Sequence, residues 1–138
     1  MRNSNFNKNI EVAKNFFGDG FTYAIVGATT NPEKYGNIVL NNLRSDGYNV
    51  VPINPNYDDI EGLKCYKNIS DCSENISVAV FVIPPNSASM MKEQLLSKKI
   101  TKVWMQPGSE SQEMALFCKD NKIEYIQDAC IMVVKNLI

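Results

Sequence analysis

The sequence predicts an α/β fold in three layers, a doubly wound parallel sheet of about five strands with helices on both faces. Short apolar runs rich in β-branched or aromatic residues alternate along the chain with segments of helical periodicity. The runs are apolar at nearly every position, as in parallel strands that are buried on both faces. The chain has 138 residues, 44% of them hydrophobic, which is enough for one compact domain over residues 1–138.

Each element follows from a local pattern. Apolar runs predict four strands and a fifth, weaker one, at residues 21–26, 49–54, 78–83, 102–106 and 123–127. Apolar residues three and four positions apart predict an N-terminal helix within residues 1–20 and later helices at about 35–46, 87–98 and 111–121. Residues 21–134 form the expected core. The connection 55–77 is expected to hold short turns, with room for one helical turn.

Composition excludes several classes of function. The chain carries 14 Lys and Arg against 15 Asp and Glu, well interspersed, so nucleic acid and anionic membranes are not expected partners. It lacks the roughly 20-residue apolar run of a membrane span and the apolar core of a secretory signal, and we expect a cytoplasmic protein. The absence of histidine excludes a histidine base, a phosphohistidine and the commonest zinc ligand, and we expect no metal site.

The fold class points to a place for a ligand. In doubly wound sheets, ligands bind outside the carboxyl ends of the strands, where the strand order reverses. Four strand exits qualify, at residues 27–36, 54–57, 84–87 and 106–109, and each carries Gly, Pro, Asn or hydroxyl residues. Turn residues are needed at such exits in any case, so a single loop would be weak support.

The first exit, GATTNPEKYG, has the chemistry of a phosphate-binding loop. Gly27 allows close approach of the backbone to an anion, Thr29 and Thr30 offer hydroxyl donors, and Lys34 adds a positive charge. Gly36 lets the following helix begin close to the sheet, so that its positive dipole end faces the anion. The loop matches neither the dinucleotide pattern nor the Walker pattern, so a nucleoside triphosphatase is not expected.

The second strand argues against a nicotinamide cofactor. Dinucleotide enzymes carry a carboxylate near its end that binds the ribose hydroxyls, whereas this chain has Asn54, Pro55 and Asn56 there. Asp58 and Asp59 follow a few residues too late. An NAD(P)-binding oxidoreductase or redox sensor on the same fold stays an alternative, as does a scaffold subunit with an empty crevice.

Five blocks in order carry a family resemblance: GATTNPEKYG, GYNVVPINPNYDDIEGLKCY, FVIPP, VWMQPGSESQE and DACIMV. They resemble the small stand-alone CoA-binding proteins, whose Rossmann-like domain also forms the front of succinyl-CoA synthetase alpha subunits. The resemblance implies that the chain binds coenzyme A or an acyl-CoA at the carboxyl ends of its strands. It leaves open whether the chain pairs with a second copy or another protein. It implies these ligand-binding residues: Gly27, Ala28, Thr29, Thr30, Lys34, Gly36, Asn54, Pro55, Asn56, Ile83, Pro84, Pro85, Gln106, Pro107 and Gly108.

The resemblance does not extend to catalysis. In acyl-CoA synthetases this domain works with a second domain and a phosphorylated histidine, so we expect neither synthetase activity nor catalytic residues in this chain. The cysteines Cys65, Cys72, Cys118 and Cys130 form no C-x-x-C pair and read mainly as packing residues. One hypothesis remains at the fifth strand end, where Asp128 or Cys130 would lie near the crevice and a thiolate would exchange with CoA.

Overall fold

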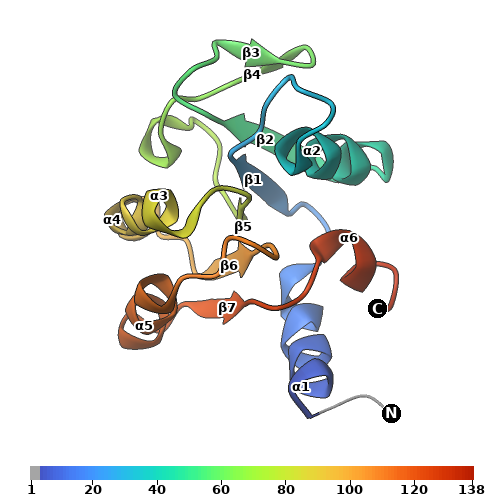
Figure 1. The fold of residues 1–138 in the computed structure, drawn as a ribbon, viewed down its shortest axis with the longest axis vertical. Coiled ribbons are helices and arrows are strands. Elements are labelled where there is room, and N and C mark those ends of the chain that lie inside the picture. The colour runs from blue at the N-terminus through green and yellow to red at the C-terminus, as the bar shows by residue number, and fades with distance from the viewer. Residues whose placement is uncertain (1–3) are drawn as a thin grey trace.

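A computed structural model describes residues 4–138 and contains a five-stranded parallel sheet (Figure 1). Its strands lie in the order β2-β1-β5-β6-β7. All five predicted strands are confirmed, each one or two residues shorter than expected: β1 (Thr22–Val26), β2 (Asn49–Ile53), β5 (Val78–Phe81), β6 (Lys102–Met105) and β7 (Glu124–Ile126). Every pair in this sheet is parallel, as the uniformly apolar runs predict.

The strand order reverses beside β1. From β1 the chain passes through α2 (Tyr35–Ser45) to β2, then returns across β1 to reach β5 on its other side. Val26 at the end of β1 pairs with Ile53 of β2 and with Phe81 of β5, so the three strands end level. Their exit loops therefore meet at one edge of the sheet, at the switch point.

Helices cover both faces of the sheet, which confirms the three layers (Figure 1). Alternate residues of β1 enter two different cores, because successive side chains of a strand point to opposite faces. Tyr23 and Ile25 pack with one set of elements and Ala24 and Val26 with the other. The first set contains α1 (Ser4–Ala13), η1 (Lys14–Phe16), α2 and α6 (Ile131–Val134); the second contains η2 (Ile69–Asp71), α3 (Pro85–Ser89), α4 (Lys92–Ser97) and α5 (Gln112–Asp120).

The N-terminal helix covers the sheet near β7. The side-chain amide of Asn9 donates to the carbonyl oxygen of Gln127, 3.1 Å away, and Phe16 is completely buried. The Phe16 ring meets the ring of Trp104 edge-on, with 5.7 Å between centroids. Trp104 is itself completely buried, so it is a core residue rather than a surface for a ligand to stack on.

The single helix predicted at 87–98 is wrong. The structure has two short helices there, α3 and α4, separated at Met90 and Met91. The amides of Met91 and Gln94 bond to carbonyls three residues back, at 3.0 Å each, so tight turns replace the α-helical pattern. The Pro, Asn and Ser residues of PPNSAS have low helix propensity, which explains why one long helix does not form.

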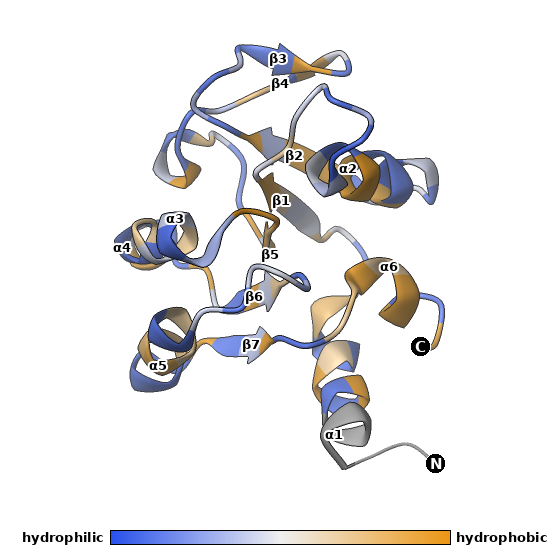
Figure 2. Cartoon of the chain, in the orientation of Figure 1, coloured by the Kyte–Doolittle hydropathy of each residue, from blue (hydrophilic) through white to orange (hydrophobic). Residues whose placement is uncertain are grey.

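Two elements were not predicted at all. The 55–77 connection contains a small antiparallel hairpin, β3 (Asp59–Ile60) and β4 (Leu63–Lys64), where only turns were expected, and the single turn η2 where there was room for one. Helix α6 follows β7 and is almost wholly hydrophobic (Figure 2). Both are too short to give a periodic signal. Among residues 4–138, no helix is long and apolar enough to cross a membrane.

Candidate functional site

The exits of β1, β2 and β5 enclose a groove made of two adjoining hollows, which we call the exit groove. The larger, the polar hollow, has a volume of about 630 Å³ and is lined by Gly27, Thr29, Asn31, Glu33, Lys34, Tyr35, Gly36, Asn54, Asn56, Tyr57, Val82 and Ile83. The smaller, the apolar hollow, measures about 320 Å³ and is lined by Val26, Gly27, Ile53, Asn54, Pro55, Asn56, Ile83, Ser87, Met90 and Met91. Four shared residues join the two hollows: Gly27, Asn54, Asn56 and Ile83.

Two glycines set the shape of the groove. Gly27 has a φ of 102°, and a Cβ there would lie 2.3 Å from Cγ2 of Ile83 and 2.5 Å from the carbonyl oxygen of Val82. A Cβ on Gly36 would lie 2.0 Å from the carbonyl oxygen of Gly27. Real Cβ atoms do not come so close, so only glycine fits at either position. The two glycines therefore bring the first turn of α2 against the β1 exit.

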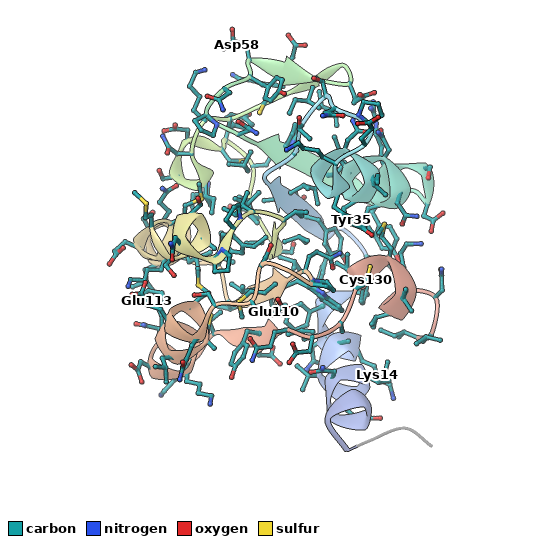
Figure 3. The ribbon with its side chains drawn as sticks, viewed as in Figure 1. Lys14, Tyr35, Asp58, Glu110, Glu113 and Cys130 are labelled. Atoms are coloured by element: carbon teal, nitrogen blue, oxygen red, sulfur yellow. The ribbon has the colours of Figure 1, made fainter. Side chains whose placement is uncertain are left out.

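The amino end of α2 is open toward the polar hollow. Lys34 precedes the helix in an extended conformation, and its carbonyl accepts from the amides of Asn37 and Ile38, at 3.1 Å each. Among the hydrogen bonds of residues 4–138, none uses the amide of Tyr35 or Gly36, and both residues line the hollow. Tyr35 is labelled at this end of α2 in Figure 3. Free amides at a positive helix end suit an anion.

The charged residues of the polar hollow have opposite signs. Lys34 is exposed and adds a positive charge at the loop, while the neighbouring Glu33 brings a carboxylate to the lining. Anion binding therefore depends on the amide donors and hydroxyls as well as on the lysine, because the net charge of these two side chains is close to zero.

Side-chain amides hold the loops together. The Asn54 amide donates to the carbonyl oxygen of Ala28 at 2.8 Å, and its oxygen accepts from the backbone N–H of Asn56 at 2.9 Å. The buried Asn37 amide donates to the carbonyl oxygen of Thr29, also at 2.9 Å. Asn54 thus ties the β2 exit to the β1 exit, and Asn37 ties the β1 exit to α2.

Sequence reasoning missed Tyr57. Its hydroxyl lies 2.9 Å from Oγ1 of Thr29 and 3.5 Å from Oγ1 of Thr30, at the rim of the polar hollow. The hydrogen bond with Thr29 lowers the pKa of Tyr57 below its ordinary value, and the bond with Thr30 lowers it further. The available signal was one aromatic residue inside the turn-rich stretch NPNYDD, where a tyrosine is not needed to form a turn.

The structure brings about half of the predicted ligand-binding residues together. Those that line the groove are Gly27, Thr29, Lys34, Gly36, Asn54, Pro55, Asn56 and Ile83. Those outside both hollows are Ala28, Thr30, Pro84, Pro85, Gln106, Pro107 and Gly108. Ala28 is buried behind the loop, and Pro84 and Pro85 begin α3, where proline is favoured. A role at a ligand stays a prediction for all fifteen residues.

Gln106 supports the fifth strand exit. Its side chain is 3% exposed, and its oxygen accepts from the backbone N–H of Ile131 at 2.7 Å. Its amide donates to Sγ of Cys130 at 3.4 Å. Cys130 is half-buried where the chain enters α6 (Figure 3), and neither it nor the exposed Asp128 lines the exit groove. Thiol exchange at Cys130 therefore stays a prediction. Within residues 4–138, no three Cys, Asp or Glu side chains gather in a way that could hold a metal ion.

Known proteins show which family has this architecture. The sequence model of the CoA binding domain matches residues 21–136. An ADP-forming acetate–CoA ligase of Methanocaldococcus jannaschii is 43% identical over 61 residues, which are 44% of this chain and 9% of the ligase. This chain thus spans less than a tenth of that ligase in the match.

Solved structures that resemble this chain include a small protein of similar length and part of a much larger synthetase. A conserved hypothetical protein of Pyrococcus furiosus is 44% identical, with a TM-score of 0.78 over 82% of this chain and 97% of its own. The dinucleotide-forming acetyl-coenzyme A synthetase 1 of Ca. Korarchaeum cryptofilum, solved with phosphate and ADP, is 25% identical, with a TM-score of 0.71 over 83% of this chain and 27% of the synthetase. Because the family match runs from the first strand of the sheet to the last helix, the chain belongs to the CoA binding domain family.

Proposed function

We propose that the exit groove binds coenzyme A or an acyl-CoA, with the ligand phosphates at the loop of residues 27–36. One observation carries the proposal. The backbone amides of Tyr35 and Gly36 have no hydrogen-bond partner among residues 4–138, and both residues line a hollow at the switch point of the sheet. The chain that presents these free donors belongs to the CoA binding domain family. Phosphate oxygens accept hydrogen bonds without offering any, so they match these donors.

The two hollows suit different parts of such a ligand. The polar hollow offers backbone amides, the Thr29 hydroxyl and Lys34 to phosphates. The apolar hollow, beside Ile83, Met90 and Met91, offers less polar walls to the parts of the ligand that carry no charge. The shared lining at Gly27 and Asn54 lets one ligand run through both.

The β2 exit supports CoA over a nicotinamide dinucleotide. Asn54 and Asn56 line the groove at the position where dinucleotide enzymes place a ribose-binding carboxylate. The Asp58 carboxylate is outside both hollows and pairs with Lys67, with 3.3 Å between Oδ1 and Nζ. No carboxylate of the β2 exit lines the groove, so a ribose that carries a phosphate is not repelled from that side; the Glu33 carboxylate belongs to the β1 exit.

Isothermal titration of nucleotide-stripped protein with CoA, NADH and NADP in parallel tests the proposal. We expect CoA to bind and the dinucleotides not to bind. Lys34→Ala should weaken CoA binding about two- to fivefold, as expected for one exposed charge. The control Lys119→Ala removes an exposed lysine at the far end of α5 and should leave the affinity unchanged.

Three results would contradict the proposal. Binding of NADH or NADP in place of CoA would favour the oxidoreductase or redox-sensor alternative. No binding of any of the three compounds would favour a scaffold subunit. Equal loss of CoA affinity in Lys34→Ala and Lys119→Ala would show that the effect of Lys34 is not specific to the loop.

A further inference from the structure

The tyrosine that sequence reasoning missed joins the core to the ligand loop. The Tyr57 ring packs against the buried cluster on the α2 side of the sheet, while its hydroxyl reaches the polar hollow. The Tyr57 backbone N–H bonds to the carbonyl oxygen of Asn54 at 3.5 Å, so its backbone is tied to the β2 exit while its hydroxyl bonds to Thr29 at the β1 exit. Its hydroxyl therefore has a fixed position beside the threonines of the β1 exit.

The hydroxyls of Thr29, Thr30 and Tyr57 form one hydrogen-bonded group. Tyr57 bonds to Oγ1 of Thr29 at 2.9 Å and accepts from Oγ1 of Thr30 at 3.5 Å. The backbone N–H of Asn31 also donates to Oγ1 of Thr29, at 3.2 Å. Each hydroxyl carries one hydrogen, so the three hydroxyls can donate three hydrogen bonds, and two of these are made within the group.

The third hydrogen belongs to a residue that lines the polar hollow. The Thr30 hydrogen is used in the bond to Tyr57. In the bond between Tyr57 and Thr29, whichever hydroxyl accepts keeps its own hydrogen free. The free hydrogen is therefore on Thr29 or on Tyr57. Both residues line the hollow, and among residues 4–138 no acceptor is found for that hydrogen. Either arrangement leaves one hydroxyl donor in the same space as the free amides of Tyr35 and Gly36.

We infer that Thr29, Thr30 and Tyr57 act as one hydroxyl donor for a phosphate oxygen, and that Tyr57 is the residue that positions it. The inference rests on the proposed function, because the phosphate is that of the CoA ligand. A hydroxyl that had a protein acceptor would gain little from a ligand, whereas a donor left without one gains a charge-assisted hydrogen bond. Tyr57 thereby favours an anionic group at this place over a neutral one.

The test is a double-mutant cycle in CoA binding. Tyr57→Phe removes the hydroxyl and keeps the ring, and Thr29→Val removes the other hydroxyl at nearly constant shape. We expect each single change to weaken CoA binding about tenfold, the typical effect of one hydrogen bond to a charged group. Either single change leaves the other hydroxyl with its hydrogen but without the partner that positions it, so the double variant should bind no more weakly than the weaker single variant.

Two controls separate positioning from folding. Tyr66→Phe also removes a tyrosine hydroxyl from a hydroxyl pair, with Oγ of Ser73 at 2.8 Å, but Tyr66 lines neither hollow. It should leave CoA affinity unchanged. Thr29→Ser keeps the hydroxyl and should keep most of the affinity, and Thr29→Ala replaces Thr29→Val in the cycle if the valine variant does not fold.

The outcomes are distinct from those of the proposed function. If the wild type binds CoA but Tyr57→Phe binds it equally well, or if the two losses simply add, the inference fails and the proposed function stands. If the wild type does not bind CoA, the proposed function fails, and a titration with inorganic pyrophosphate decides the inference. Weaker pyrophosphate binding by Tyr57→Phe then supports it, and equal or absent binding overturns it.

Discussion

The carbonyl oxygen of Gly27 lies so close to Gly36 that a Cβ built on Gly36 would be 2.0 Å from it. This contact places the first turn of α2 directly against the β1 exit, although the two glycines are nine positions apart in the sequence. It also fixes where the free amides of that turn lie relative to the sheet. The contact is between backbones, so no change of side-chain rotamer can relieve a clash there.

Gly36→Ala should therefore weaken both the fold and the groove. The added methyl group forces the β1 exit and the start of α2 apart, at a cost of about 2 to 3 kcal/mol in the free energy of unfolding. We expect a lower melting temperature and a loss of CoA affinity, measured by thermal unfolding and by calorimetry.

Gly47→Ala provides the matched control. Gly47 has a φ of 91° but no atom within 4 Å of a built Cβ, so only backbone strain opposes alanine. That strain should cost about 1 kcal/mol and leave CoA affinity unchanged. Equal effects of the two substitutions would show that the Gly27–Gly36 contact has no special importance.

Asn54→Ala should separate the β1 and β2 exits. It removes the 2.8 Å bond to the carbonyl oxygen of Ala28 and the 2.9 Å bond from the N–H of Asn56. We expect a loss of about 1 to 3 kcal/mol of stability in urea unfolding, together with weaker CoA binding. As a control, Asn42 has a buried side-chain oxygen without a partner among residues 4–138, so Asn42→Ala should cost less. A larger loss in Asn42→Ala would contradict this view of Asn54.

Gln106→Leu should destabilise the protein and spare ligand binding. The substitution leaves the N–H of Ile131 without its acceptor at 2.7 Å, in a place where the side chain is 3% exposed. An unsatisfied buried donor costs about 1 to 3 kcal/mol, which a thermal unfolding curve would show. Unchanged stability with lost CoA affinity would instead place Gln106 at the ligand, as the family resemblance implies.

Alkaline pH should destabilise the protein through its buried thiols. Burial raises the pKa of Cys118 from 9.0 to about 12, and burial also raises the pKa of Cys65 and Cys72. Between these values the folded state binds more protons than the unfolded state. Stability is therefore complete below about pH 9 and falls as pH rises toward 12, by about 1.4 kcal/mol per pH unit for each thiol that stays protonated.

Urea unfolding at about pH 8 and about pH 10 measures this slope. Cys118→Ala removes the thiol whose pKa burial raises to about 12, so the stability of this variant should fall less between the two conditions than that of the wild type. A wild-type stability that does not change over this range would contradict the prediction.

Local patterns were enough for the sheet and for three of its helices, α1, α2 and α5. Each strand is an apolar run with a β-branched or aromatic character, and burial on both faces leaves few other structures for such a run. Ser111 before α5 and Gly47 after α2 lie at helix ends: the Ser111 hydroxyl accepts from the N–H of Met114 at 3.1 Å, and Gly47 has a φ of 91°. The β3–β4 hairpin and α6 escaped prediction, because segments of two to four residues carry no period.

The sequence by itself determined which strand exits could hold a ligand and that the loop after the first strand is rich in hydrogen-bond donors. Only the tertiary structure decided which exits meet. The β1, β2 and β5 exits share one groove, whereas Gln106 at the β6 exit is used to hold α6. The same holds for Tyr57, which reaches Thr29 across 28 positions. Contacts between residues far apart in the chain depend on how strands pair and helices pack, and no local spacing records them.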